Sequence, residues 1–284
     1  MSVTRKELNE LTNEYDDFAI NFIKNLNTQL TNVRSTTGKD KKLELLMEYY
    51  TFMEYLAQQP DMANSSQWSI IHYTKTMGDL YSIYTLLRDG MIYQSLEVLR
   101  SMTDTAFSAK YISLDPTKRG TLFVDHVYIE QYFLASDADK HQFEANYNTH
   151  KGKYKINESQ GFSNGWYHQE MKDLITNDPI YNTDSAFRGK NPSIKLMAQI
   201  GGLIDLYHSV YSLGSGFTHG GSHLRPFLSR IPEYNPQVTQ FVIGMTLKVL
   251  TVVVDSIINA ENINTHAYEE LHQLTSLNIA KKLL

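Results

Sequence analysis

Apolar residues recur every three or four positions over most of the chain, which is the period of an amphipathic α-helix. The first such stretch ends near the polar segment 35–38, where glycine can stop a helix. A second stretch runs from Leu43 to Ala57, and Pro60 closes it because proline cannot continue a helix. The apolar face of the first stretch consists of Leu8, Leu11, Tyr15, Phe18, Phe22, Leu26 and Leu30.

The next two periodic stretches predict a helical hairpin. The first is expected over Trp68–Arg88, after a capping cluster at 64–66, and the second over Met91–Ser113. Asp89–Gly90 supplies the turn, since glycine adopts the left-handed conformation that ends helices. Further helices are predicted over 117–135, after Asp115-Pro116, and over 137–149.

Between residues 150 and 192 the periodic pattern is lost. This stretch is polar and rich in Gly and Asn, with short apolar pieces, so we expect a long loop insertion there, either a surface connection or a lid. Helical periodicity returns over 193–211, 238–259 and 266–282. The pattern predicts an all-α fold: a single multi-helix bundle domain spanning 1–284, with its core at about 66–260.

Composition narrows the class of protein further. A hydrophobic fraction of 42% and a charged fraction of 20% are typical of a globular protein. The chain has no cysteine, which excludes disulfides and a cysteine nucleophile, and its first residues show no secretory pattern. We therefore expect a cytoplasmic protein. A net charge of −5 argues against broad electrostatic binding of nucleic acid, although it does not exclude a small basic groove.

The most apolar stretch, 241–258, is long enough to span a membrane. Lys248 and Asp255 lie inside it, and charges are costly in a bilayer. A buried core helix is the favoured interpretation, so we expect no membrane partner; membrane association through this helix is the alternative.

The segment from Tyr211 to His223 concentrates the residues that could carry chemistry. Tyr211, Ser215 and His219 are four apart, so a continuing helix would place them on one face, and glycines follow His219. The histidine would then lie at a helix C-terminus, where the helix dipole favours its protonated form. The alternative is a structural role, in which the small residues allow a tight contact between helices and the histidine caps the last carbonyls of its helix. Ser215 with His219 is also half of a nucleophile–base pair, but no oxyanion hole is evident.

His219 and His223 have the H-x-x-x-H spacing that can chelate zinc on a helix. The two glycines between them interrupt a helix, and no glutamate follows the first histidine, unlike H-E-x-x-H enzymes. His72, His126 and His168 are scattered and form no ligand set. We therefore expect no metal and no cofactor, and His223 stays a binding candidate.

Arg100 is the second candidate. Glu97 precedes it by three residues and Asp104 follows it by four, among the apolar residues Leu96, Val98, Leu99 and Met102. Such an arginine is either an ion-paired helix residue or a guanidinium held by carboxylates and directed at an anionic ligand.

These two segments carry a family resemblance. LLRDGMIYQSLEVLRSMTDTAFSAKYI (86–112) and IKLMAQIGGLIDLYHSVYSLGSGFTHGGS (194–222) resemble a bacterial family of helical proteins similar in style to the HEPN superfamily. The resemblance implies a HEPN-like core, a homodimer and a role as a metal-independent ribonuclease in toxin or antiviral (phage) defence systems. By position, the resemblance also implies that a pocket is lined by Arg100, Asp104, Tyr211, Ser215 and His219.

Two functions follow as hypotheses. In the first, a HEPN-like ribonuclease, Arg100 stabilises the charge of the scissile phosphate and His219 acts as general acid or base on RNA. HEPN nucleases carry an arginine four to six residues before the histidine, and the residues before His219, SLGSGFT, contain none. The second hypothesis is therefore a non-enzymatic helical module that binds a protein partner or a small anionic ligand as a sensor or scaffold.

Overall fold

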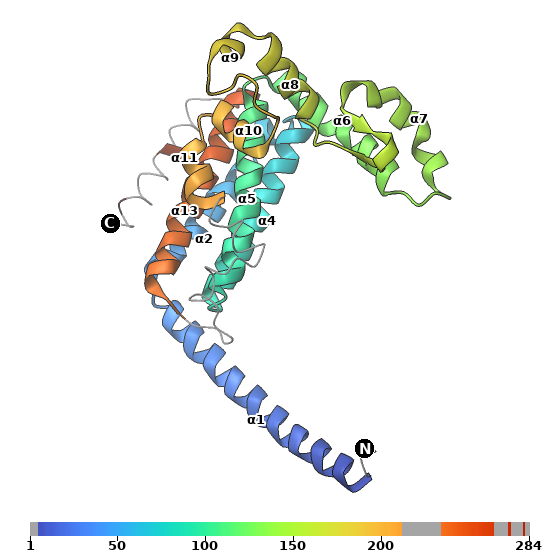
Figure 1. The fold of residues 1–284 in the computed structure, drawn as a ribbon. Coiled ribbons are helices and arrows are strands. Elements are labelled where there is room, and N and C mark those ends of the chain that lie inside the picture. The colour runs from blue at the N-terminus through green and yellow to red at the C-terminus, as the bar shows by residue number, and fades with distance from the viewer. Residues whose placement is uncertain (1–4, 212–233, 264–271, 274–280, 282–284) are drawn as a thin grey trace.

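The computed structural model describes residues 5–211, 234–263, 272–273 and 281, with side chains from residue 12 onward. It shows an all-α bundle, as the hydrophobic pattern predicted, in which the long helices α2, α4, α5 and α13 lie side by side (Figure 1). The helices are α1 (Arg5–Thr37), α2 (Lys41–Ala57), α3 (Pro60–Ala63), α4 (Gln67–Arg88), α5 (Ile92–Ser113), α6 (Pro116–Leu134), α7 (Lys140–His150), α8 (His168–Asn177), α9 (Pro179–Thr183), α10 (Ile194–Ile200), α11 (Ile204–Leu206) and α13 (Pro236–Glu261).

The hairpin of α4 and α5 is the centre of the bundle. Its turn is at Asp89–Gly90, where Gly90 has a φ of 73°. Only glycine adopts this angle without steric cost, so the turn follows directly from the sequence. Asp89 also accepts two hydrogen bonds from Arg34, at 3.0 and 2.9 Å, which join the end of α1 to this turn.

The apolar helix α13 packs against α5, α4 and α2. By length and composition it could cross a membrane, but 61% of its most apolar window is buried inside the protein. Val242, Val249 and Val253 are fully buried, and Asp255 lies at the helix edge, where His272 approaches it at 2.8 Å. This burial is that of a core helix, as the charged residues within the stretch indicated.

Helix α6 leads away from the bundle into an arm (Figure 1). There α6 packs on α7 and on a two-stranded antiparallel sheet of β1 (Ile156–Asn157) and β2 (Phe162–Ser163), with Ile156 opposite Ser163. The arm has a small apolar cluster of its own, formed by Leu122, Ile129, Tyr147 and Tyr154.

The segment 150–192 differs from the loop that we expected. It contains β1, β2, α8, α9 and two single 3₁₀ turns, joined by short connections. Helix α8 is only ten residues long and is anchored by Met171, Ile175 and the buried carboxylate of Glu170. A charged anchor does not register in an apolar pattern, so the periodicity does not reveal this helix.

The expected helix over 193–211 is interrupted. α10 ends at Ile200, and Gly202 has a φ of 71°. The chain then forms α11 and one π-helical turn over Tyr207–Tyr211. Such π turns occur frequently at functional sites, and this one packs on α5 beside Arg100.

Candidate functional site

A pocket of about 320 Å³ opens between α4, α5, α6, α10 and the residues that precede α8. This volume is at the lower end of the range for small-molecule sites. Its walls are mainly apolar and aromatic, and five polar side chains line it as well. The lining residues are Ile71, His72, Lys75, Asp104, Thr105, Ser108, Phe123, Trp166, Tyr167, Ile194 and Met197.

His72 forms one polar wall of the pocket. Its Nδ1 lies 2.7 Å from the backbone oxygen of Trp68 and its Nε2 lies 2.8 Å from Ser108 Oγ. A carbonyl only accepts, so Nδ1 carries the proton and Nε2 accepts from the serine hydroxyl. Burial lowers the pKa of His72 to about 4, so the ring is neutral at physiological pH.

This serine–histidine pair lacks the features of a hydrolase. Ser108 lies inside α5, where backbone N–H groups are used by the helix and cannot bind an oxyanion. The pair instead holds a neutral imidazole against the ring of Phe123, with centroids 4.6 Å apart.

Arg100 lies one helical turn before Asp104 on α5 and has two partners. One guanidinium nitrogen donates to the hydroxyl of Tyr211 at 2.9 Å, and the guanidinium carbon lies 4.7 Å from the centre of the Tyr211 ring. A second nitrogen lies 3.9 Å from a carboxylate oxygen of Asp104. Tyr211 in turn stacks on Tyr207, with centroids 4.8 Å apart. The arginine is therefore held from two sides.

Two buried polar atoms of this pair have no hydrogen-bond partner among the described residues. They are Arg100 Nε, a donor, and Asp104 Oδ1, an acceptor in the ionised carboxylate. Unpaired buried polar atoms are rare because each costs about 1–3 kcal/mol. Asp104 lines the pocket and Arg100 lies one helical turn away on the same helix, so a ligand that offers both a donor and an acceptor is of the kind that could satisfy them.

Burial raises the pKa of Asp104 to about 6, although Arg100 and Lys75 act in the opposite direction. The folded state thus favours the neutral carboxyl, and its stability falls as the pH rises from about 4 to about 6. His72 acts oppositely: its lowered pKa makes stability rise with pH between about 4 and 6.5.

The Asp104→Asn variant should therefore be more stable than wild type at pH 8, because the ionised carboxylate is removed. We expect a gain in the free energy of unfolding of about 1 kcal/mol, reduced from the full linkage value by solvent screening of a partly exposed side chain. Urea unfolding at pH 5 and pH 8 measures it, and the difference between variant and wild type should shrink at pH 5. Asp173→Asn, at an exposed position on α8, is the control and should change neither value. An Asp104→Asn protein that is less stable than wild type at pH 8 would contradict the raised pKa of Asp104.

Three of the residues proposed from sequence come together in the structure: Arg100, Asp104 and Tyr211. Ser215, His219 and His223 lie outside the described residues, so the proposed meeting of Arg100 with His219 stays a prediction. Among the described residues, no group of three or more His, Asp or Glu side chains could hold a metal ion.

Apart from Asp104, the residues of the pocket do not stand out in the sequence. His72 is one of several scattered histidines there, and no motif marks Lys75, Trp166 or Tyr167. One signal was available: Arg100, Asp104 and Ser108 are spaced by four and share a helix face. Trp166 could not be placed because it comes from the segment without a clear pattern.

A model of DUF5677, a family of unknown function, matches residues 66–233. This is more than half of the chain, and the chain therefore belongs to that family. The matched region includes α4, α5, α6 and α10, which form the pocket. Comparison with curated proteins and with solved structures finds no significant match.

Proposed function

We propose that this member of the DUF5677 family binds a small ligand that carries a nucleobase, as a sensor or scaffold, with the base in the aromatic pocket. The observation that carries the proposal is the unpaired donor–acceptor pair of Arg100 Nε and Asp104 Oδ1 next to that pocket. Nucleobases present donors and acceptors side by side on a flat ring, and they stack on aromatic side chains.

The aromatic walls suit a flat ligand. Trp166 lies edge-on to Phe123, with centroids 5.5 Å apart, and edge-on to Tyr167 at 5.8 Å. Base stacking on such rings contributes about 1–3 kcal/mol per base. Lys75 supplies a positive charge at the pocket, although it is also bound to Asp79 at 2.5 Å. A phosphate on the ligand would be attracted to Lys75 and Arg100.

The test is calorimetric titration with the four ribonucleoside monophosphates, and with ribose 5-phosphate and inorganic phosphate as controls. We expect at least one nucleotide to bind and neither control to do so. Asp104→Ala should weaken binding by about tenfold or more, since it removes a hydrogen bond to a buried ligand. Asp173→Ala is the matched control and should bind normally. Equal binding of inorganic phosphate, or no binding of any nucleotide at millimolar concentration, would contradict the proposal.

A second candidate is a cytoplasmic, HEPN-like, metal-independent ribonuclease of a bacterial toxin or defence system. It is favoured by the carboxyl of Asp104, whose pKa of about 6 suits a general acid or base, beside Arg100, which could stabilise a phosphate. In this proposal Asp104 joins His219 as a candidate for proton transfer.

Cleavage of short single-stranded RNAs in the presence of EDTA tests this candidate. Arg100→Lys, Asp104→Asn and His219→Ala should each reduce cleavage, and Asp173→Asn should not. RNA that stays intact at high protein concentration, for several sequences and with or without added metal, would eliminate the ribonuclease while leaving nucleotide binding testable.

A further inference from the structure

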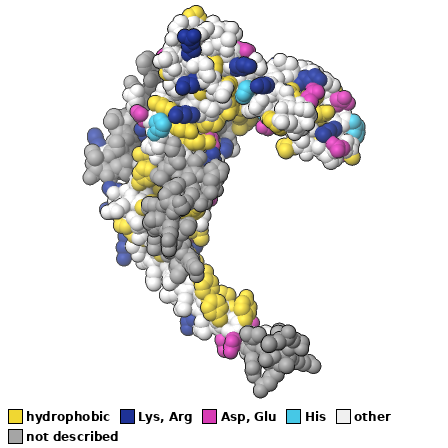
Figure 2. All heavy atoms as spheres, in the orientation of Figure 1, with side chains coloured by type: hydrophobic (Ala, Val, Ile, Leu, Met, Phe, Trp, Pro, Cys, Tyr) yellow, Lys and Arg dark blue, Asp and Glu magenta, His cyan; other side chains and the backbone are white. Residues whose placement is uncertain are grey.

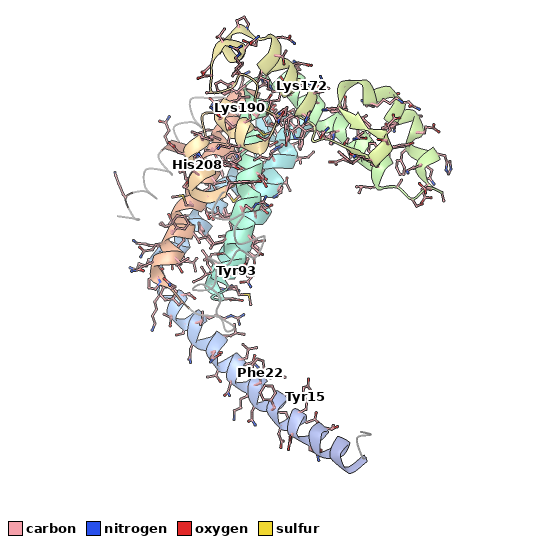
Figure 3. The ribbon with its side chains drawn as sticks, in the orientation of Figure 1. Tyr15, Phe22, Tyr93, Lys172, Lys190 and His208 are labelled. Carbon is pink, nitrogen blue, oxygen red and sulfur yellow. The ribbon has the colours of Figure 1, made fainter. Side chains whose placement is uncertain are left out.

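Helix α1 carries an exposed aromatic stripe with no described partner. Tyr15, Phe18 and Phe22 are 67%, 64% and 48% exposed, although they follow one another at spacings of three and four. Phe18 and Phe22 stack with ring centroids 5.8 Å apart. Figure 3 shows Tyr15 and Phe22 projecting from the same side of α1, and Figure 2 shows hydrophobic side chains exposed along it.

The stripe continues into the part of α1 that packs on the bundle. Leu26, Leu30 and Val33 are half-buried and Thr37 is buried, where α1 contacts α4. The same apolar face is thus covered by the chain at one end of the helix and exposed at the other. The heptad-like spacing of the exposed part is that of a coiled-coil seam.

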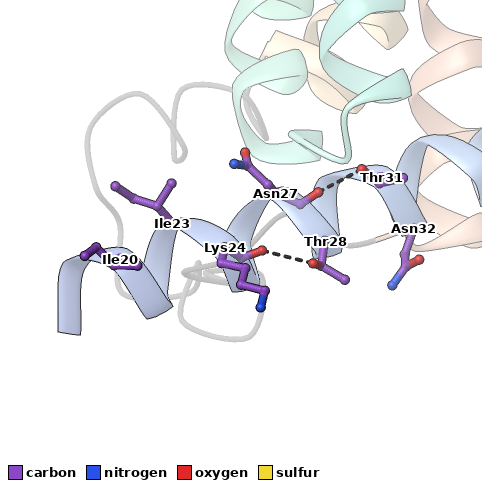
Figure 4. Close-up of a pocket in the computed structure, with 7 residues that line it drawn as sticks. All are labelled: Ile20, Ile23, Lys24, Asn27, Thr28, Thr31 and Asn32. Carbon is purple, nitrogen blue, oxygen red and sulfur yellow. Dashed lines mark hydrogen bonds between the residues drawn. The ribbon is translucent and has the colours of Figure 1, made fainter. Parts of the chain in front are cut away.

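The opposite side of α1 has a different character. Ile20 and Ile23 are exposed there and line a hollow of about 610 Å³ with Lys24 and Thr28, whose hydroxyl bonds back to the Lys24 carbonyl at 2.9 Å (Figure 4). In the heptad defined by Tyr15, Phe18 and Phe22, Ile20 falls at the position farthest from the seam.

Charge is divided unevenly along α1. Residues 5–17 contain five acidic side chains and two basic ones, Arg5 and Lys6, a net charge of −3, whereas residues 18–37 contain two basic side chains, Lys24 and Arg34, and no acidic one. A parallel pair of these helices would place like charges together. An antiparallel pair with its axis level with residue 20 instead brings Asp16 of each helix level with Lys24 of the other, within the part of α1 that the bundle leaves exposed.

We propose that α1 pairs with α1 of a second copy of this chain, antiparallel, through the stripe of Tyr15, Phe18 and Phe22. With the two-fold axis level with residue 20, Phe18 of each copy lies against Phe22 of the other, so the four rings form one buried cluster. The pairing is isologous and closes at two copies.

The first experiment measures mass by size-exclusion chromatography with light scattering. Wild type should elute as a dimer, at twice the monomer mass of 32.7 kDa. The double variant Phe18→Glu/Phe22→Glu should be monomeric, or raise the dissociation constant by about 30-fold or more, as loss of central aromatic anchors does. Ile20→Glu is the matched control, because it places the same charge on the other side of α1, and it should stay dimeric. Circular dichroism should show that both variants remain helical.

The second experiment determines whether the two helices are parallel or antiparallel. Because the chain has no native cysteine, any disulfide must come from the introduced residue. Ala19→Cys lies beside the proposed axis and should form a disulfide between copies. Thr12→Cys occupies the equivalent heptad position one repeat earlier, where an antiparallel pair separates the two cysteines by about 24 Å along the axis. It should not cross-link, whereas a parallel pair would bring residue 12 of the two copies to the same level.

A monomeric wild type at 100 µM, or a dimer that Ile20→Glu disrupts and Phe18→Glu/Phe22→Glu does not, would overturn the proposal. A wild-type monomer that binds vesicles of anionic phospholipid through Phe18 and Phe22 would also overturn it, and would assign the stripe to a membrane surface. Efficient cross-linking of Thr12→Cys would reject the antiparallel arrangement.

Discussion

Replacing Glu170 by alanine should destabilise the protein by about 3–5 kcal/mol, because it leaves a buried guanidinium without its charge partner. Arg119 and Glu170 are both about 95% buried, and the Arg119 Nε lies 3.2 Å from a Glu170 carboxylate oxygen. The other carboxylate oxygen accepts a hydrogen bond from the hydroxyl of Tyr111. In the alanine variant, the Arg119 guanidinium and the Tyr111 hydroxyl would both stay buried without this partner.

The geometry around Arg119 explains why the loss should be large. Its guanidinium lies 3.9 Å from the centre of the Tyr111 ring and donates to the Tyr111 backbone oxygen at 2.9 Å. Three elements, α5, α6 and α8, therefore meet at one charged group. Burial raises the pKa of the Tyr111 hydroxyl, so it stays a neutral donor to Glu170.

Urea unfolding at pH 7 measures the effect, with Asp173→Ala on the exposed side of the same helix as the control, expected within about 0.5 kcal/mol of wild type. The pair variant Arg119→Met/Glu170→Leu should recover much of the loss, since apolar residues of similar volume can replace a buried ion pair. If Glu170→Ala itself unfolded within about 1 kcal/mol of wild type, the buried pair would not hold α8 in place.

The helical bundle could be predicted from the sequence because its core obeys a simple period. The turn at Gly90 and the two helices beside it follow from apolar spacing and one glycine, and the helices begin and end within one residue of the predicted bounds. Helix α13 is recognisable as a core helix because Lys248 and Asp255 interrupt its apolar run. In these segments the local preference for helix and the burial of the apolar face favour the same structure.

Other parts depend on contacts between segments far apart in the chain. Glu170 anchors α8 through Arg119, 51 positions earlier, and no period in the sequence reports such a pair. The pocket has the same origin: Arg100 and Asp104 could be proposed from their spacing, but His72 meets Ser108 only because α4 and α5 pack at that level. The sequence predicts an amphipathic helix for α1, but its apolar face is exposed at Tyr15, Phe18 and Phe22 because this part of the helix projects from the bundle.

Gly120→Ala should also destabilise the protein strongly, by about 1–3 kcal/mol, because the added methyl overfills a packed interior. A Cβ at this position would lie 2.5 Å from Cδ1 of Trp68 and 2.9 Å from its Nε1. The Trp68 side chain is 2% exposed, so the indole has little room to move. The close approach of α6 to α4 at Trp68 therefore requires a glycine at position 120.

Two other helical glycines provide the controls. A Cβ at Gly78 of α4 or Gly244 of α13 would meet nothing within 4 Å. Because alanine favours the helix over glycine, Gly78→Ala and Gly244→Ala should each gain up to about 1 kcal/mol. Thermal unfolding of the three variants separates crowding from helix propensity, since Gly120→Ala alone should unfold at a lower temperature than wild type.

The effect of Gly120→Ala should extend to the pocket. Trp68 presents its backbone oxygen to His72 and lies edge-on to the His72 ring, with centroids 5.8 Å apart. Moving the indole would therefore disturb the histidine that Ser108 and Phe123 hold at the pocket wall. We expect nucleotide binding to weaken in Gly120→Ala and to be unchanged in Gly78→Ala. Normal stability in Gly120→Ala would mean that α6 is free to shift away from α4, and that the position of Phe123 in the pocket is not fixed by this contact.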